Sequence, residues 1–491
     1  MGKPAGLGGL RRLLAVLTGG LMLAWPAFLA GYPLVFSDSA AFLHQTQGPL
    51  MIWDKPWIYG PLIFLFHWNL SLWPVVVAQG LMLSHLLWLL LRAFGGGASA
   101  GRHLLLCGML AALTALPFSV AMVMPDVLTP AVALCAVLLA FGRASLSRGE
   151  VIWLCVLGSV GAAAHLSHLP MLGALMVVAL LGGWRAAGRV AVPLFGAVAL
   201  LLATNAVGHG KLSLSPYGST FLLARMVANG SAIRTIEARC PEAGWALCAF
   251  EGRLAPYGPE VCSTRHCPRE LLPSDIFLWE PSSPVNRDEA GQPRHFGGRA
   301  LSGEAREIVR ETVVREPFAV AWDALRDTLL QLAANRVGDT LERRHIGEGV
   351  LGRIEAFGPE ETARFRAGAQ WRDAMRGLAA PFLWIQGPVL VIGALALALL
   401  GWIGRRDRAA LGLALGIGIA ILANAFATGA LSGPHDRYGA RLAWLVVAGA
   451  VALGMRRQRA HGEASEASPL APDGEPSAPA GLSVGAASLK G

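Results

Sequence analysis

The charges of this chain fall in the gaps between about ten apolar runs, and the gaps are of two alternating kinds. Every second gap is basic, with Arg11 and Arg12, Arg92 and Arg102, Arg143 and Arg148, Arg185 and Arg189, Arg405, Arg406 and Arg408, and Arg456, Arg457 and Arg459. The gaps between them carry Asp, His and Tyr: Asp38 and His44, Asp126, His165 and His168, and residues 435–438. Short loops rich in Lys and Arg stay in the cytoplasm when a chain is threaded through a membrane. The pattern therefore predicts a multi-pass membrane protein whose reactive side chains gather on the outer side.

Composition supports a lipid environment. Hydrophobic residues make up 54% of the chain and charged residues 15%. The net charge of +9 would also suit a nucleic-acid partner, but the arginines sit at the ends of apolar runs. Arginine in that position is typical of topology signals and of contacts with anionic lipid head groups. The expected partner is the lipid bilayer, and nucleic acid is not expected.

The apolar runs set the predicted architecture. Crossing the hydrocarbon core takes roughly 20 apolar residues. Candidate runs lie at 13–35, 72–94, 103–123, 127–142, 150–164, 170–184, 190–207, 381–403, 409–431 and 438–455. We predict an all-α polytopic membrane protein of about ten transmembrane helices with both termini in the cytoplasm. Its parts are an N-terminal membrane module (1–207, with first outer loop 36–71), an extracytoplasmic α-rich domain (208–380), a C-terminal membrane module (381–457) and a disordered cytoplasmic tail (458–491).

The outer segment 208–380 contains four of the seven cysteines: Cys240, Cys248, Cys262 and Cys267. An even set confined to one outer segment predicts two disulfides, Cys240–Cys248 and Cys262–Cys267, in an oxidising compartment. Free thiols and a zinc site are the alternatives, although these spacings differ from those of a C-x-x-C zinc ribbon. From 303 to 376 the apolar spacing indicates amphipathic helices, and so a domain resting on the membrane.

Two acids lie at the outer ends of apolar runs. Asp38 opens the first outer loop, where a carboxylate can accept a proton from a sugar hydroxyl, or can simply cap a following helix. Asp126 lies in a very short turn between two runs. Charges so close to the hydrocarbon are costly and tend to be functional, although Asp126 also suits the N-cap of the fourth span.

The last outer gap, residues 433–441, is the most polar of the short outer loops. Arg437 and Arg441 are four residues apart, so on a helix they share a face and suit bidentate binding of a phosphate. Snorkelling of both side chains to lipid phosphate is the alternative. His435 and Asp436 stand beside them and are also candidate substrate-binding residues.

Two further sets of residues carry weaker signals. Lys211 and Tyr217 follow the seventh run, where they form either a further substrate-binding lining or a solvated surface. His165 and His168 would share a helix face as a metal pair, but unremarkable loop histidines fit equally well. A divalent metal is a possible cofactor, and no metal ligands are assigned.

The arrangement resembles the GT-C superfamily of integral-membrane glycosyltransferases, most of all its bacterial members that use polyprenyl-phosphate sugars. The resemblance rests on the acid in residues 36–40 (Phe-Ser-Asp-Ser-Ala) after the first run, the acid in residues 125–128 (Pro-Asp-Val-Leu) and the large outer domain after the seventh run. It covers most of residues 10–455, mainly as architecture. The first loop has Ser-Asp-Ser where many members have paired acids, and the arginine often found before the second acid is absent.

The resemblance implies a bacterial inner-membrane enzyme that moves a sugar from a polyprenyl-phosphate donor to an envelope glycan or lipid acceptor. Asp38 would then be the general base, and Asp126 would position substrate or a divalent ion. We further assign Arg437 and Arg441 to the donor phosphate. The alternatives are a transporter or flippase of a lipid-linked or anionic solute, a ligase-like transferase with His435 as its base, and a non-enzymatic envelope scaffold.

Overall fold

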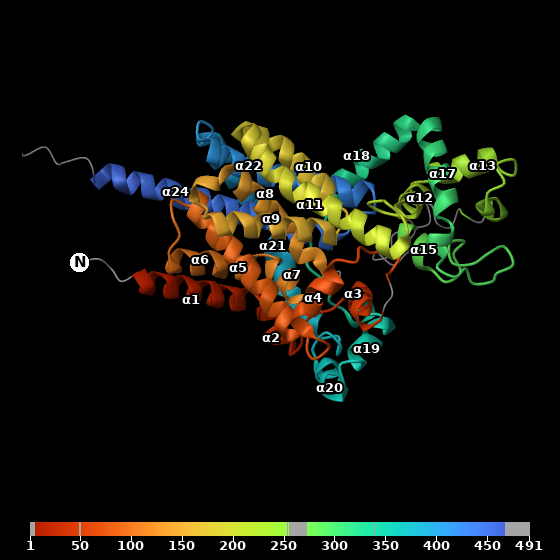
Figure 1. Cartoon of the computed structure of the whole chain (residues 1–491), viewed down its shortest axis with the longest axis horizontal. Coiled ribbons are helices and arrows are strands. Elements are labelled where there is room, and N and C mark those ends of the chain that lie inside the picture. Colours follow the sequence, from red (N-terminus) through yellow and green to blue (C-terminus); the bar gives the residue numbers. More distant parts are fainter. Residues whose placement is uncertain (1–4, 49–50, 253, 255–272, 339, 467–491) are drawn as a thin grey trace, which may run out of the picture.

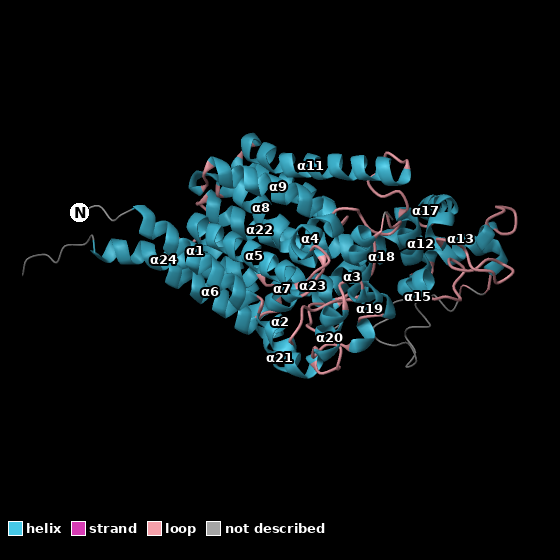
Figure 2. Ribbon diagram, turned by 60° about the horizontal axis from the view of Figure 1, so that its bottom comes forward, coloured by secondary structure: helices cyan, strands magenta, loops and turns pink. Residues whose placement is uncertain are grey.

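The computed structural model describes residues 5–48, 51–252, 254, 273–338 and 340–466. Within those residues the chain is helical and contains no strand (Figure 2). The first half contains α1 (Ala5–Leu23), α2 (Trp25–Ala30), α3 (Ser37–Gln47), α4 (Tyr59–His67), α5 (Trp73–Phe94), α6 (Ala100–Leu113), α7 (Leu116–Ala121), η1 (Pro125–Val127), α8 (Leu128–Phe141), η2 (Arg143–Ser145), α9 (Arg148–Ala164), α10 (His168–Ala179), η3 (Leu180–Gly182) and α11 (Trp184–His209).

Segment 208–380, called the outer segment after the side that the sequence predicts for it, and the C-terminal part complete the helical chain. The outer segment contains α12 (Gly218–Ala228), α13 (Ser231–Arg239), η4 (Ala246–Phe250), α15 (Pro273–Trp279), α16 (Gly297–Ala300), α17 (Ser302–Arg315), α18 (Pro317–Ala333), η6 (Arg343–His345), α19 (Glu348–Glu355) and α20 (Pro359–Ala367). The C-terminal part contains α21 (Met375–Ile403), α22 (Arg408–Ala425), η7 (Phe426–Ala430), α23 (Asp436–Ala443) and α24 (Leu445–Glu466).

Each predicted apolar run coincides with one helix or with two consecutive helices. In the described part of the chain, five helical stretches are long and apolar enough to cross a membrane: Trp73–Phe94, Trp184–His209, Met375–Ile403, Arg408–Ala430 and Asp436–Ala460. Two of the other runs are broken where a proline begins a new helix, Pro26 in α2 and Pro117 in α7. Proline has no backbone N–H and clashes with the preceding turn, so it favours the first turn of a helix over the interior.

The basic gaps meet at one end of the helix bundle. Arg12 donates a hydrogen bond to Glu150 at 3.0 Å, Arg92 pairs with the same carboxylate, and Arg456 pairs with Asp407. The start of α1 and the end of α24 lie at this end, whereas α12, α13, α15 and α17 lie at the opposite end (Figure 1). The basic gaps and the gaps with Asp, His and Tyr alternate in sequence and therefore lie at opposite ends of the bundle.

A second, smaller hydrophobic core lies in the outer segment. Its buried residues come mainly from α12, α13, α15 and α17, with Leu223, Ile236, Phe277 and Ile308 among them. The disulfide Cys240–Cys248 joins the end of α13 to η4, which confirms that predicted pair. Cys262 and Cys267 lie outside the described residues.

The later part of the outer segment packs on the large core of the helix bundle, not on this smaller core. Val350 and Ile354 of α19 belong to the large core of the bundle, where α19 packs on α3. The Gln370 side chain accepts a hydrogen bond from the Val35 N–H at 3.0 Å and donates one to the Val35 carbonyl at 2.7 Å. The segment 208–380 is thus divided between two cores, and its second half holds the first outer loop in place.

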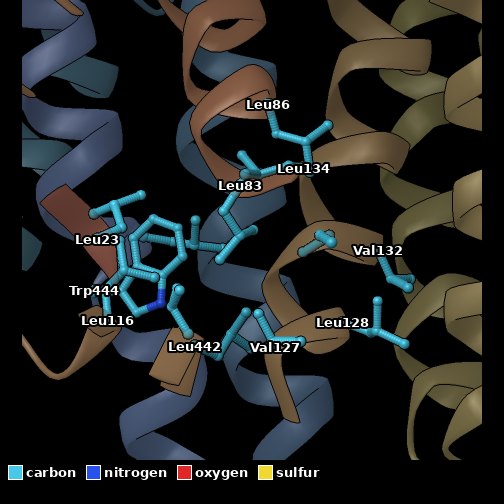
Figure 3. Packing of buried hydrophobic residues seen from close by; sticks show 14 of the residues in the cluster. Leu23, Leu83, Leu86, Leu116, Val127, Leu128, Val132, Leu134, Leu442 and Trp444 are labelled. Atoms are coloured by element: carbon cyan, nitrogen blue, oxygen red, sulfur yellow. The ribbon is translucent and has the colours of Figure 1, made fainter. Parts of the chain in front are cut away.

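An apolar layer of the large core lies where α23 meets α24. Trp444 is fully buried there, near Leu23, Leu116 and Leu442, with Val127 alongside (Figure 3). Its indole N–H donates to the Arg441 carbonyl oxygen at 2.9 Å, which satisfies the one polar atom that this large side chain buries. This layer fixes the start of α24 and, through it, the helix α23.

At the C-terminus α24 continues to Glu466. The tail predicted to be disordered from 458 therefore begins as helix, and residues 467–491 lie outside the described part of the chain.

Candidate functional site

The carboxylate of Asp38 does not cap the helix in which it lies. Helix α3 begins at Ser37, after Phe36 in extended conformation. The Phe36 N–H donates to Ser39 Oγ at 3.0 Å, and that hydroxyl donates to the Val123 carbonyl at 2.9 Å. Ser39 therefore ties the start of α3 to the turn before Asp126 and leaves the Asp38 side chain for other contacts.

Two cations hold the Asp38 carboxylate. Lys55 Nζ lies 3.0 Å from Asp38 Oδ1, and Arg437 Nη2 lies 3.5 Å from Asp38 Oδ2. Lys55 also pairs with Asp54 at 2.8 Å. The Asp38 side chain is 31% exposed, whereas those of Lys55 and Arg437 are 15% and 16% exposed. The site is thus open on the carboxylate and enclosed around the cations.

This arrangement keeps Asp38 ionised. Burial alone would raise the pKa of Asp38, but Lys55 and Arg437 outweigh that effect and hold it below its usual value. Burial likewise opposes the charge on Lys55, yet Asp38 and Asp54 raise the pKa of Lys55 above its usual value. At neutral pH Asp38 is therefore negatively charged and Lys55 is positively charged.

Arg437 and Arg441 share one face of α23, as their spacing predicts, and Tyr438 lies between them. The guanidinium carbons lie 4.8 Å and 4.9 Å from the centre of the Tyr438 ring. Arg437 also stacks on Phe36 at 4.5 Å. Aromatic faces attract guanidinium groups, so the Tyr438 ring helps to hold each of the two side chains in its own position.

Asp126 and Arg441 form a buried ion pair behind this cluster. Arg441 Nη1 donates to Asp126 Oδ1 at 3.1 Å, and the Arg441 side chain is 1% exposed. Its Nη2 donates to Ser167 Oγ at 3.2 Å and to Asn424 Oδ1 at 2.9 Å. Asp126 therefore does not cap α8, and Arg441 binds side chains of the protein rather than pointing outward beside Arg437.

The two histidines near the α9–α10 turn, His165 and His168, make different contacts. His168 is buried, and its ring nitrogens contact Thr129 Oγ1 at 2.7 Å and the Gly161 carbonyl at 2.8 Å. Both nitrogens are therefore engaged in protein contacts. The ring of His165 lies 6.4 Å from that of Tyr438. Burial, together with Arg441, holds the pKa of His165 well below its usual value, so it is neutral at pH 7.

The residues at the start of α23 contact the outer segment. His435 Nε2 lies 3.4 Å from Asp275 Oδ2 of α15. Asp436 Oδ1 accepts a hydrogen bond from the Arg336 backbone N–H at 2.9 Å. Asp436 thus fixes the connection after α18, whereas His435 pairs with a carboxylate that is itself partly exposed.

Lys211 and Tyr217 lie in a separate aromatic group. Lys211 Nζ sits 4.6 Å above the Tyr217 ring, and Trp53 packs edge-on to the same ring at 6.4 Å. Trp53 also contacts Trp279 of α15 at 5.9 Å. Because Trp53 is two residues before Lys55, this group borders the Asp38 cluster through the first outer loop.

Sequence reasoning brought Asp38, Asp126, Arg437 and Arg441 to one end of the molecule but missed Lys55. A signal for it was present, because Lys55 is the only lysine or arginine between residues 36 and 71. Among the described residues, no group of three or more His, Cys, Asp or Glu side chains is placed to hold a metal ion.

No protein-family model matches the sequence, and comparison with curated proteins and with solved structures gives no match either.

Proposed function

We propose that this protein is a glycosyltransferase of the bacterial inner membrane that moves a sugar from a polyprenyl-phosphate donor to an envelope glycan or lipid. In this proposal about ten helices cross the membrane, both termini are cytoplasmic, and the Asp38 cluster faces the outer side. The observation that carries the proposal is the contact of Asp38 with Lys55 and Arg437. A partly exposed carboxylate between two enclosed cations combines a proton acceptor with a binding site for a phosphate.

The cluster also suggests how substrate would activate the base. The low pKa that the two cations give Asp38 makes it a weak base before substrate binds. A donor phosphate would compete with the carboxylate for Lys55 and Arg437. The carboxylate would then lose part of its electrostatic stabilisation, and its pKa would rise toward the value that proton transfer requires.

The transfer step can be written with each group in a role. The acceptor hydroxyl oxygen attacks the anomeric carbon as the bond from that carbon to the phosphate oxygen breaks. The hydroxyl proton passes to a carboxylate oxygen of Asp38. The polyprenyl phosphate leaves with its negative charge against Lys55 and Arg437, where charge-assisted contacts stabilise it. Asp126 acts through Arg441 by holding α23, and therefore Arg437, in position.

The position of the cluster favours this chemistry over transport. A transporter places its binding groups near the middle of the bilayer, often at broken helices. Here the charged groups lie at the ends of α3, α8 and α23, beside the outer segment.

Replacing Arg437 is expected to weaken use of the donor. Arg437→Ala removes a charge-assisted contact worth roughly 1.5–3 kcal/mol, so KM for a polyprenyl-phosphate sugar should rise about 10- to 100-fold. Arg437→Lys should recover only part of this loss, because an ammonium cannot make the planar two-point contact. Steady-state transfer by the purified protein in liposomes measures both values.

Arg336→Ala is the matched control, because Arg336 is an exposed arginine close to α23 whose backbone contacts Asp436. It should leave KM unchanged. An Arg437→Ala protein with the same KM as Arg336→Ala would show that the donor phosphate does not bind at this site.

The pairing of His435 with Asp275 supports a second candidate, a ligase-like transferase in which His435 is the base. A carboxylate beside an imidazole can orient the ring and stabilise its protonated form. In that case His435→Ala would abolish transfer and Asp38→Asn would not.

A further inference from the structure

Helix α18 exposes a predominantly apolar face. The exposed residues of this helix are Pro317, Phe318, Ala321, Trp322, Leu325, Leu329, Leu330 and Ala333. Phe318 is 87% exposed and Trp322 is 65% exposed, values like the 67% of Leu395 on the span candidate α21. Soluble surfaces rarely present a continuous apolar strip of this kind to water.

Most polar residues of α18 point inward instead; the exception is Arg326, whose side chain is 40% exposed and pairs with Asp323 and Asp327. Asp327 is 1% exposed and pairs with Arg225 of α12 at 2.9 Å. The side-chain amide of Gln331 donates to the His435 carbonyl and accepts from the His435 N–H, both at 2.9 Å. A helix with its polar side chains in the protein and its apolar side chains outside is inverted relative to a water-exposed helix.

The helix is firmly seated at the outer end of the bundle. It packs along η7, where a Cβ added to Gly429 would lie 2.5 Å from the Asp327 carbonyl oxygen. Only glycine permits so close a backbone approach. Leu422 near the end of α22, Phe426 at the start of η7 and Leu431 just after η7 are also exposed and apolar. The apolar face of α18 therefore continues the surface of a span candidate.

The helix before it behaves differently. The exposed residues of α17 include Arg306, Glu307 and Arg310, followed by the apolar Val313 and Val314 at the end next to α18. In Figure 1, α18 runs from the outer end of the bundle to α17. The exposed surface therefore changes from charged in the first part of α17 to predominantly apolar at the end of α17 and along α18.

We infer that α18 is a non-spanning membrane helix that lies in the outer leaflet with Phe318, Trp322, Leu325 and Leu329 against lipid acyl chains. Trp322 suits this depth, since tryptophan concentrates at the membrane interface. Apolar helix faces bury themselves at the boundary between head groups and acyl chains. Because Gln331 is hydrogen-bonded to the His435 backbone before α23, α18 also fixes the cluster around Arg437 to the membrane surface. The inference rests on the proposed topology, with segment 208–380 on the outer side of a bilayer, and it stands whether or not the protein is a glycosyltransferase.

Spin-label accessibility tests the inference on the full chain in liposomes of phosphatidylethanolamine and phosphatidylglycerol. Single nitroxides are attached at Phe318→Cys, Leu325→Cys and Leu329→Cys, in a background where every cysteine except the disulfide pair Cys240 and Cys248 is replaced by alanine. Collision rates with oxygen, which concentrates in lipid, and with a water-soluble nickel chelate are compared. Arg306→Cys and Arg310→Cys on α17 are the matched water-facing controls.

Oxygen should dominate at the three α18 positions, and the nickel chelate should dominate at the two α17 positions. Dominant nickel collisions on α18 would place the face in water and overturn the inference. Low collision rates with both reagents would show that protein, such as a second copy of the chain, covers the face, and would overturn it equally. Three positions along the helix guard against one variant that fails to fold.

Discussion

Asp38→Asn is expected to reduce the rate of sugar transfer by roughly 10²–10⁴-fold, the usual share of a general base. Asparagine keeps the shape of the side chain but cannot accept the hydroxyl proton. Donor binding should be preserved or tightened, because the substitution removes the carboxylate that occupies Lys55 and Arg437 in the unliganded protein. Single-turnover transfer with saturating polyprenyl-phosphate sugar isolates the chemical step.

Asp54→Asn is the matched control for this experiment. Asp54 pairs with the same lysine as Asp38, at 2.8 Å, and no ion pair joins it to Arg437. The Asp54→Asn variant tests whether the loss of rate in Asp38→Asn comes from the charge balance at Lys55 or from the missing base. It should retain most of the turnover. An Asp38→Asn protein with wild-type transfer rates would end the proposed mechanism.

Breaking the buried pair between Asp126 and Arg441 is expected to destabilise the protein strongly. Asp126→Ala leaves the guanidinium of Arg441, which is 1% exposed, without its carboxylate. Removing one partner of a buried ion pair typically costs about 3–5 kcal/mol, because an uncompensated charge stays in the interior. The free energy of unfolding, measured by SDS titration in mixed micelles, reports this loss.

Two comparisons make this prediction specific. Glu355→Ala breaks the half-exposed pair of Glu355 with Arg366, so it should cost no more than about 1 kcal/mol. The double replacement Asp126→Leu with Arg441→Met removes both charges and should restore much of the stability lost in Asp126→Ala. A single Asp126→Ala variant as stable as Glu355→Ala would show that Arg441 is not held by Asp126.

The sequence predicted the helical class and the grouping of the site because both depend on patterns along the chain. Apolar runs of the right length form helices wherever they occur, and the alternation of basic and non-basic gaps sorts the helix ends onto two sides. Asp38, Asp126 and Arg437 could therefore be predicted to lie at one end of the molecule without any knowledge of packing. The disulfide Cys240–Cys248 was predictable for a similar reason, since it closes a short local loop.

The pairing of charges within the site was not predictable in this way. The spacing of Arg437 and Arg441 correctly placed them on one face, but it could not show that Arg441 turns inward to Asp126, 315 residues away in sequence. The helix period could not show that Thr129 and the Gly161 carbonyl engage His168. Such choices depend on which helices pack together and on burial, which a local pattern does not contain.

Helix α18 illustrates the same limit. Its amphipathic period is visible in the sequence, and it predicts that one face is apolar. The period alone does not say whether that face packs on protein or points outward. Only the burial of Asp327 and Gln331 identifies the helix as inverted.

Equilibrium binding of a polyprenyl phosphate to the purified protein in liposomes tests the central claim most directly. If the cluster is the donor-phosphate site, two substitutions within it should affect the Kd differently. Arg437→Ala should weaken binding about 10- to 100-fold, since it removes a charge-assisted contact. Asp38→Asn should bind at least as tightly as the wild type, since it removes a competing carboxylate. A Kd that neither substitution changes, or a wild-type protein that does not bind the lipid phosphate, would contradict the assignment of this cluster to a polyprenyl-phosphate donor.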